Sequence, residues 1–512
     1  MVAAALGLTF SHWGYRQTTQ VQRILTLIAV SLNLLIALWL LYQTIGHDER
    51  LVLQMGLWPA PFGITVMADG LSAIMLSLTA ILAVAITCYA MGTLDERDRM
   101  NFYPLLLFLL MGVNGAFLAG DLFNLYVFFE VLLMASFVLL TLGGQPAQIS
   151  GGIRYVVLNL MASVIFLSAA GIAYGTLGTL NLAHLAMRME QTPPSIQALL
   201  AGMLLVAFSS KAGLFPIYFW LPSSYHTPHP AVTAFFGGLL TKVGVYTLFR
   251  VFSLLFPHYL ETWQPLILTI AGCTMVTGVF GAMAVNTVRR VLSFHVISQV
   301  GYMIMGLGLA VNAAGSNPQL AAGFGLSAGI LYLVHHMIVK TALLMAGGAA
   351  EMEMGTGALR ANQLSGLIAR RPLLSVIFFF AAFSLAGVPP SSGFVSKLGL
   401  LQAALDTQHW WIAAVSLLVS VFTLMSMVRL WQYAFTGSAS QSLSPMAPLT
   451  SGRRRWLTLL PIGALVALSL AIGIFSAPVF QWSTIAAQQV LDREGYISAV
   501  HPSDEITQVD HK

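Results

Sequence analysis

Lysine is rare in this chain, and the positions of the few lysines indicate proton chemistry. Five lysines occur among 512 residues, and four of them, Lys211, Lys242, Lys340 and Lys397, lie inside long apolar segments. The arginines instead fall in loops or near the ends of apolar segments. An amine in a bilayer core costs roughly 2.5–3.5 kcal/mol on insertion scales, and a desolvated lysine can release its proton whereas an arginine effectively cannot. This pattern predicts a protein that handles protons inside a membrane.

A carboxylate is expected to face one of these lysines. Glu130 lies within an apolar helix, between bulky residues of the segment 128–134. A lone carboxylate there would stay protonated, whereas one that faces an ammonium could ionise. Lys211 is the expected partner because it stands beside a helix break. Movement of Glu130 would then tune the proton affinity of Lys211, although a static ion pair that only joins two helices stays open as an alternative.

Two histidines precede the third lysine on one helix. His336 and Lys340 are four residues apart and therefore share a helix face. A neutral imidazole accepts and donates at once, so His335 and His336 are candidate relays between lysines. The alternative is that they are core histidines bonded to backbone carbonyls. A metal site is disfavoured because no carboxylate or third histidine lies near them in sequence, and metal ligands stay unassigned.

The remaining polar residues of the apolar segments complete a candidate polar axis in the plane of the membrane. Lys242 is surrounded by small residues that admit close helix contact or water, too deep in its span for the amine to reach the surface, and Lys397 closes the series. His295 is expected near the cytoplasmic interface, either as a proton-uptake group or as a cap of local backbone. Asp69 and Asp121 stand at helix starts, where carboxylates cap the first turn.

Composition excludes a water-soluble protein. The chain is 57% hydrophobic and 8% charged with a mean hydropathy of +0.82, and apolar runs of about 20 residues recur along it, which is typical of membrane-spanning helices. The net charge of +5 comes from arginines in particular loops and does not indicate nucleic-acid binding. Both cysteines lie in predicted spans, so no iron–sulfur site, disulfide framework or other cofactor is expected.

The fold class predicted is an all-α polytopic membrane protein of about 14 transmembrane helices. The apolar piece 1–10 is too short to cross a bilayer, so it either lies at the interface or, as we favour, is the second half of a truncated first helix. Thirteen further spans are predicted at 22–44, 68–91, 101–120, 121–142, 152–178, 196–221, 230–256, 264–285, 290–311, 319–348, 373–403, 409–434 and 456–476.

Helices 7 and 12 are predicted to be discontinuous. Each carries a lysine beside a Gly/Pro break, at 209–222 and at 385–399. Proline frees backbone carbonyls, which membrane depth tolerates only beside protein or a water-filled cavity. The two helices are five spans apart and so run in opposite directions, which indicates an inverted repeat.

The predicted order of parts follows from this repeat. It places N-terminal helices 1–3 at 1–100, a first five-helix repeat at 101–256, a second at 257–435, and helix 14 with a polar C-terminal tail at 436–512.

Basic residues predict the orientation of the chain in the membrane. Fourteen arginines fall in the loops of one side, and four arginines and Lys512 in those of the other. Because basic loops stay in the cytoplasm, the first side is expected to be cytoplasmic and the C-terminus extracytoplasmic.

Several sequence blocks resemble those of a known family. They are 208–216, 239–246, 293–303, 334–342 and 385–394. These blocks are similar to the antiporter-like membrane subunits shared by respiratory complex I and Mrp-type multisubunit cation/proton antiporters. Within this group the His-His-x-x-x-Lys block, the Ser-Phe-His block and a lysine at 397 resemble the D-type subunits of Mrp antiporters. The chain also ends soon after its last predicted helix, as expected for the D type.

The resemblance implies a fold and a function. It implies 14 helices with an inverted five-helix repeat, a Glu/Lys pair at Glu130 and Lys211, central lysines at Lys242 and Lys340, and a terminal lysine at Lys397. It further implies a non-enzymatic, proton-conducting subunit of a Na⁺/H⁺ antiporter in a bacterial cytoplasmic membrane, with partner subunits of the A, B, C, E, F and G types. The alternative is a proton-pumping subunit of a complex I-like NADH-quinone oxidoreductase or a membrane-bound hydrogenase.

Overall fold

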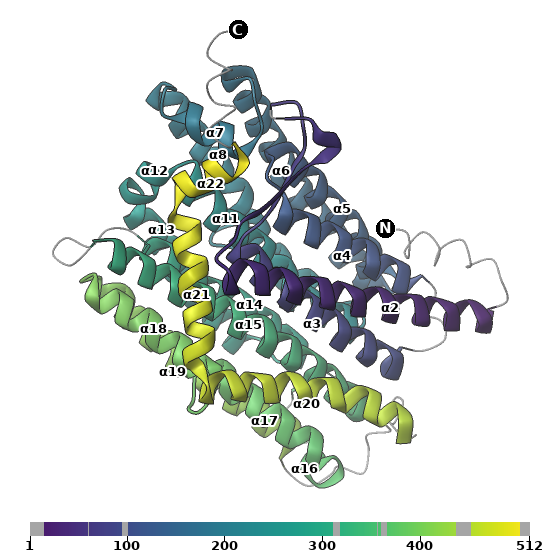
Figure 1. Ribbon diagram of the computed structural model, residues 1–512. Helices are drawn as coiled ribbons and strands as arrows, with labels where there is room; N and C mark the ends of the chain where they lie inside the picture. The colour runs from purple at the N-terminus through teal and green to yellow at the C-terminus, as the bar shows by residue number, and fades with distance from the viewer. Residues whose placement is uncertain are drawn as a thin grey trace.

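A computed structural model describes residues 15–59, 61–94, 101–310, 318–355, 357–359, 366–436 and 452–501. The described chain is a bundle of long helices with one small β-hairpin (Figure 1). The N-terminal part contains α2 (Tyr15–Leu41), the π-helix η2 (Tyr42–Gly46), β1 (Leu51–Gln54), the 3₁₀-helix η3 (Met55–Leu57), β2 (Thr65–Ala68) and α3 (Gly70–Thr93). The two strands pair antiparallel with Leu51 opposite Ala68.

The central part carries the first broken helix. It consists of α4 (Phe102–Leu118), α5 (Leu122–Thr141), α6 (Pro146–Leu177), α7 (Leu182–Met189), α8 (Pro194–Ala212), α9 (Trp220–Ser224), α10 (Pro230–Phe235), the π-helix η4 (Phe236–Leu240), α11 (Thr241–Leu254) and α12 (Pro257–Thr262). Asp121 accepts hydrogen bonds from the amides of Phe123 and Asn124, so its predicted role as the cap of α5 is confirmed.

The C-terminal part carries the second broken helix. It consists of α13 (Gln264–Ala284), α14 (Val288–Gly308), α15 (Pro318–Met354), α16 (Leu367–Arg370), α17 (Pro372–Ala386), α18 (Ser392–Asp406), α19 (Trp410–Phe435), α20 (Gly452–Ile474), α21 (Ser476–Leu491) and α22 (Arg493–Val500).

The helical membrane architecture is confirmed. In the part of the chain that the structure describes, 11 helices are long and apolar enough to cross a membrane, and Phe102–Leu118 and Pro372–Ala386 are shorter apolar helices. Together these coincide with the thirteen spans predicted from residue 22 onward. The predicted truncated helix at 1–10 lies outside the described residues, so the total of 14 helices and the inverted repeat stay predictions.

Both predicted helix breaks are present. α8 ends at Gly213, which has φ +75, and α17 ends at Gly387, which has φ +90. A side chain is strained in this left-handed region, so glycine is favoured at both positions. A cis peptide bond follows each break, at Phe215-Pro216 and at Pro389-Pro390. Each of these helices therefore leaves carbonyl groups without helical partners inside the membrane.

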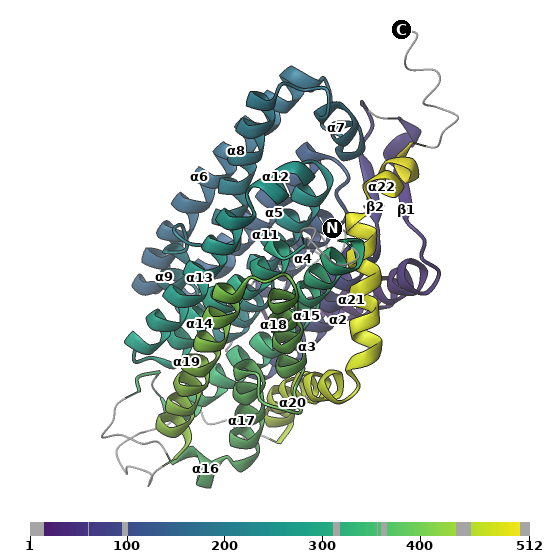
Figure 2. The same cartoon turned by 90° about the vertical axis from the view of Figure 1, so that its left-hand side faces the viewer.

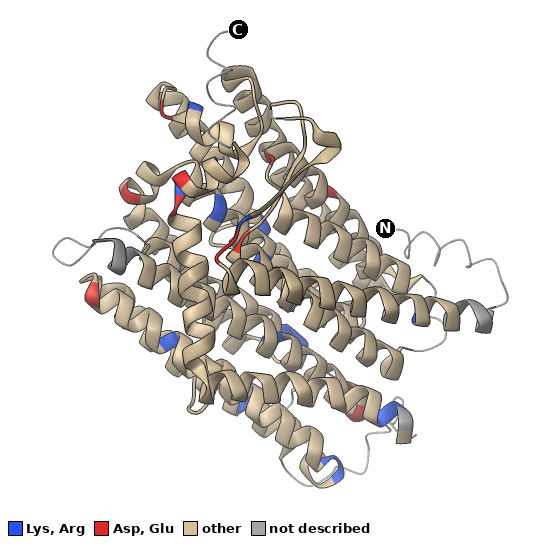
Figure 3. Ribbon diagram, viewed as in Figure 1, with Lys and Arg blue, Asp and Glu red and all other residues tan. Residues whose placement is uncertain are grey.

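The helices that carry Lys242, His295 and the group of His335, His336 and Lys340 are the most deeply buried ones. The spans 230–254 and 323–354 are wholly buried, α14 almost so, whereas α2 exposes most of its apolar surface. α2, α6 and α19 lie on the outside of the bundle, around α11, α14 and α15 (Figures 1 and 2). Charged residues are sparse along the bundle, and several lie at helix ends, such as those of α16 and α20 (Figure 3). A polar core inside an apolar shell is the arrangement that a membrane requires of ionisable groups.

The C-terminal segment folds back onto the bundle. No helices were predicted in the polar tail, but the structure forms α21 and α22 there. α21 packs against α3 and α15, and α22 contacts α7 and β1. The β-hairpin, α7 and α22 thus share one membrane face, called the hairpin face below (Figure 2). Arg493 ties α22 to this face, because it donates a hydrogen bond to the carbonyl of Leu254 and forms an ion pair with Glu190.

Acidification is expected to loosen the contact between α7 and α22. The ring of His184 stacks on that of His501 with 4.0 Å between centroids. Burial, the neighbouring His501 and Arg188 lower the pKa of His184 to about 4. The docked state therefore favours neutral His184. The stabilisation of the α7–α22 contact by this histidine is complete above the unfolded pKa of about 6.5 and is lost as pH falls toward 4.

Hydrogen–deuterium exchange of residues 182–189 provides the measurement. The protection of these amides, taken relative to their intrinsic exchange rate at each pH, is expected to fall between about pH 7 and pH 5. His184→Phe keeps the ring contact without the charge and is expected to weaken this pH dependence. The same pH dependence in both proteins would contradict the prediction.

Candidate functional site

Glu130 and Lys211 lie together, as predicted. Glu130 projects from α5 and Lys211 from the last turn of α8, with 4.0 Å between Oε1 and Nζ. The ammonium donates a 2.7 Å hydrogen bond to the hydroxyl of Ser163 on α6 and lies 5.4 Å from the centre of the Phe129 ring. The carboxylate is at the outer limit of an ion pair, so a small displacement would separate the two charges.

Lys242 lies next to an irregular turn of its helix. Its Nζ donates a 2.5 Å hydrogen bond to the carbonyl of Gly237 in η4. π-Helical turns shift the backbone hydrogen bonds from i−4 to i−5 and occur frequently at functional sites. The side chain is fully buried, so it does not reach the membrane surface.

Close glycine contacts hold this helix between those of the neighbouring lysines. A Cβ atom at Gly244 would lie 2.6 Å from the amide nitrogen of Ala212, the residue after Lys211. A Cβ atom at Gly238 would lie 2.0 Å from Oγ1 of Thr341, the residue after Lys340. The backbone around Lys242 therefore packs directly against α8 on one side and α15 on the other.

The centre of α15 carries buried nitrogens without hydrogen-bond partners. Among the described residues, these include Nζ of Lys340 and both ring nitrogens of His336, and both side chains are fully buried. Buried polar groups are nearly always hydrogen-bonded, because leaving one unsatisfied costs about 1–3 kcal/mol. Unsatisfied groups four residues apart on one helix face therefore mark a site kept for a reason other than stability.

His335 connects α15 to the second broken helix. Its Nδ1 is 2.8 Å from the hydroxyl of Ser392 at the start of α18, and that hydroxyl is 2.8 Å from the hydroxyl of Ser469 on α20. The histidine thus bonds to a side chain instead of a backbone carbonyl. A hydroxyl can accept one proton while donating another, so this contact is compatible with a relay.

Lys397 uses a carbonyl freed by the second break. Its Nζ donates a 3.0 Å hydrogen bond to the carbonyl of Ala386 at the end of α17, and it lies 5.0 Å from the centre of the Tyr302 ring. Tyr302 stacks on Tyr332 at 5.1 Å, and Tyr332 contacts the ring of His335 edge-on at 5.6 Å. An aromatic chain therefore joins Lys397 to the histidines of α15.

A side chain at Gly387 is expected to disturb Lys397. The Cβ atom of Gly387→Ala would lie 2.9 Å from Cδ of Lys397, at a residue with φ +90. The strained backbone is expected to cost about 1–3 kcal/mol, and displacement of Lys397 is expected to lower ion exchange by about tenfold. Ion exchange in membrane vesicles and thermal unfolding of the purified protein measure the two effects. Gly171→Ala on α6, where nothing lies within 4 Å, is the matched control, and an equal effect there would contradict the prediction.

His295 contacts a partner that the sequence did not predict. The residue was expected near the cytoplasmic interface, as an uptake group or a backbone cap, and its side chain is fully buried on α14. Its Nε2 lies 2.9 Å from the hydroxyl of Ser426 on α19. A serine 131 residues away in sequence supplies this partner, which a local pattern could not show.

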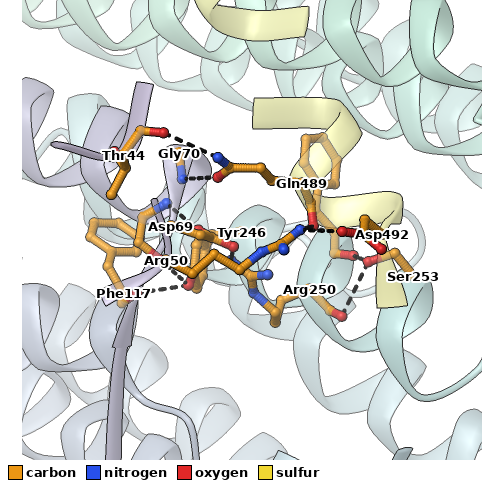
Figure 4. Close-up of polar contacts among 12 residues, drawn as sticks. Thr44, Arg50, Asp69, Gly70, Phe117, Tyr246, Arg250, Ser253, Gln489 and Asp492 are labelled. Atoms are coloured by element: carbon orange, nitrogen blue, oxygen red, sulfur yellow. Dashed lines mark hydrogen bonds and ion pairs between the residues drawn. The ribbon is translucent and has the colours of Figure 1, made fainter. Parts of the chain in front are cut away.

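Sequence analysis also missed a second buried ion pair. Asp69 caps α3 as predicted, by accepting a 3.0 Å hydrogen bond from the amide of Ser72. Its other carboxylate oxygen lies 2.5 Å from the guanidinium of Arg250 on α11, and both side chains are buried (Figure 4). Arg250 lies near the end of α11, as expected of the arginines, but its burial and its pairing with Asp69 were not predicted. The signal available in the sequence was the spacing of Lys242, Tyr246 and Arg250, four residues apart on one helix.

No cluster of three or more metal-binding side chains occurs among the residues that the structure describes.

Two further ion pairs anchor the ends of α14, α15 and α17. Arg289 contacts Glu351 at 2.5 Å, and Arg371 contacts Glu353 at 3.0 Å. These pairs lie on the face opposite the hairpin face and are separate from the lysine series.

Comparison with known proteins defines the class of this fold. The sequence profile of the family described as NADH:quinone oxidoreductase/Mrp antiporter, TM, matches residues 119–423. The chain belongs to this family, so the predicted resemblance is confirmed.

Particular relatives narrow the comparison to one kind of subunit. The chain is 44% identical to the D-type subunit of the Na⁺/H⁺ antiporter of Alkalihalophilus pseudofirmus, over 94% of each chain. Its fold is similar to a chain of the Mrp complex from Dietzia, with a TM-score of 0.87 and 31% identity over 98% of this chain and 97% of that one. It is also similar to a chain of an archaeal membrane-bound sulfane sulfur reductase, with a TM-score of 0.85 and 25% identity over 98% and 97%. The resemblance to D-type subunits is thereby confirmed.

Proposed function

We propose that this chain is the proton-conducting subunit of a multisubunit Na⁺/H⁺ antiporter. One observation carries the proposal: the four membrane lysines lie on α8, α11, α15 and α18, and each of these elements, with η4 joining α11 to α15, contacts the next. Three of the lysines lie beside a helix break or a π-turn, and the fourth, Lys340, lies on α15, which contacts the π-turn η4. Irregular backbone at membrane depth is tolerated where it lines a pathway.

Protons are proposed to move laterally from Glu130 and Lys211 to Lys397. Lys242 and Lys340 hold protons in the centre, and His335 and His336 pass them between lysines. The unsatisfied nitrogens of His336 and Lys340 support this role, since groups that exchange protons through water need free hydrogen-bonding capacity. Separation of Glu130 from Lys211 weakens the hold of Lys211 on its proton and passes it inward.

The remaining subunits of the antiporter complex are the proposed partners, in a bacterial cytoplasmic membrane. The hairpin face, with the C-terminal segment, is proposed to be extracytoplasmic, because the arginine-rich loops lie on the opposite side. Sodium is the proposed counter-ion, supported by the 44% identity to a subunit of a Na⁺/H⁺ antiporter.

Transport in everted membrane vesicles tests this function. Vesicles that contain the complete complex are expected to lose an imposed pH gradient when Na⁺ is added, and vesicles with the complex lacking this chain are not. Undiminished exchange without the chain would overturn the proposal.

A redox-driven proton pump is the second candidate, favoured by the similarity to the archaeal sulfane sulfur reductase complex. The purified complex would then carry flavin or iron–sulfur absorbance, which an antiporter lacks. Detection of these bands together with absence of Na⁺-driven exchange would favour the pump.

A further inference from the structure

The buried pair of Asp69 and Arg250 lies in line with the central lysine. Lys242, Tyr246 and Arg250 are spaced four residues apart on α11 and therefore share one helix face. This face leads from the middle of the bundle toward the hairpin face, where α11 ends at Leu254. A continuous polar path along it would let protons on Lys242 escape to that side of the membrane.

Such a path would stop at Tyr246, because its hydroxyl donates its proton to a backbone carbonyl. It donates a 2.7 Å hydrogen bond to the carbonyl of Phe117 and lies 2.9 Å from the hydroxyl of Ser72 (Figure 4). A phenol has one proton, so with that proton given to Phe117 it accepts from Ser72. A carbonyl accepts a hydrogen bond but passes no proton on, and the chain of exchangeable groups stops there.

Arg250 places a permanent cation beyond this point. Its guanidinium lies between two aromatic rings, 5.6 Å from the centre of Tyr246 and 5.4 Å from that of Tyr496 on α22. An arginine does not release its proton in proteins, and a fixed positive charge is a known barrier to protons and cations in membrane pores. Asp69 compensates the charge so that the barrier can remain buried.

The C-terminal helices cover the outer side of this pair. The amide oxygen of Gln489 accepts a 2.6 Å hydrogen bond from the amide of Gly70, next to Asp69, and its amide nitrogen donates to the carbonyl of Thr44 at 3.0 Å. Arg50 forms a 2.7 Å ion pair with Asp492 just outside it (Figure 4). These contacts join η2 and α3 to the C-terminal segment, in which α21 also packs against α11.

We propose that Asp69, Arg250 and Tyr246 form a seal that prevents protons on Lys242 from leaking to the hairpin face. The seal rests on the proposed proton conduction, and it explains why a chain that keeps lysine for the interior has one buried arginine at this position. A lysine at this position could release its proton and so pass protons on, whereas an arginine does not.

Arg250→Lys is the sharpest test of this seal. It keeps a cation beside Asp69 but makes the cation able to release its proton, so passive proton leak is expected to rise about tenfold. The complete complex is reconstituted in liposomes, and decay of a pH gradient is followed without Na⁺. Arg250→Gln, which leaves a protonatable carboxyl at Asp69, is expected to leak as well.

Control variants separate the seal from a purely structural ion pair. Arg371→Gln breaks an arginine–glutamate pair on the opposite face and is expected to leave the leak unchanged. Lys242→Ala combined with Arg250→Lys is expected to abolish the added leak. An assembled Arg250→Lys complex without added leak would overturn the seal, as would a leak that persists without Lys242. Failure of the proposed function would show separately, as Na⁺-driven exchange that does not require this chain.

Discussion

Replacement of Glu130 by glutamine or of Lys211 by alanine is expected to lower Na⁺-driven exchange at least tenfold while the complex still assembles. Two unit charges 4.0 Å apart attract by about 4 kcal/mol at an effective dielectric constant near 20. Loss of either charge therefore removes the means by which the pair binds and releases a proton.

Exchange in everted vesicles is the measurement, with the amount of assembled complex determined in the same membranes. Asp121→Asn is the matched control on the helix of Glu130, because asparagine also caps a helix and the residue lies outside the lysine series. Loss of assembly in the Glu130 and Lys211 variants, with normal exchange per assembled complex, would favour the alternative of a static pair.

Lys340→Met is expected to abolish exchange and to leave the thermal stability of the complex equal or higher. Methionine has nearly the length of lysine but needs no hydrogen bond. Because Nζ of Lys340 makes no hydrogen bond to another described residue, the substitution breaks no hydrogen bond within the described chain and removes a buried amine whose desolvation costs free energy. Function and stability are thus expected to change in opposite directions.

Lys397→Met is the comparison for this prediction. Nζ of Lys397 donates to the carbonyl of Ala386, so its removal leaves that acceptor unsatisfied and is not expected to stabilise the protein. Thermal unfolding of the purified complex and vesicle exchange measure both effects. Normal exchange by Lys340→Met, or a large loss of stability, would show that Lys340 serves the fold instead of proton transfer.

The spans, the two breaks and the Glu130–Lys211 contact could be predicted because local patterns determine them. Apolar runs of membrane length identify helices, Gly and Pro mark their interruptions, and a lone buried carboxylate requires a cation. Lys211 combined a helix break with the cation that Glu130 requires, and in the structure Glu130 lies beside Lys211.

Contacts between distant segments could not be predicted in this way. Arg50 and Asp492 are 442 residues apart, and neither Gln489 nor Tyr496 carries a local pattern that assigns it a partner. The α21 and α22 helices are too polar to be recognised as spans, and their positions follow from packing against α3, α7 and α15. The sequence explained Asp69 fully as a helix cap, so no second partner was sought, and its ion pair with Arg250 was not predicted.

A cryo-EM map of the intact complex, at a resolution that shows ordered water, tests the lateral proton relay most directly. Relay along the lysine series predicts water molecules that bridge Lys242, His336 and Lys340 and continue toward Lys397. Dry aliphatic packing between these side chains, with no density for water, would contradict proton transfer along this series.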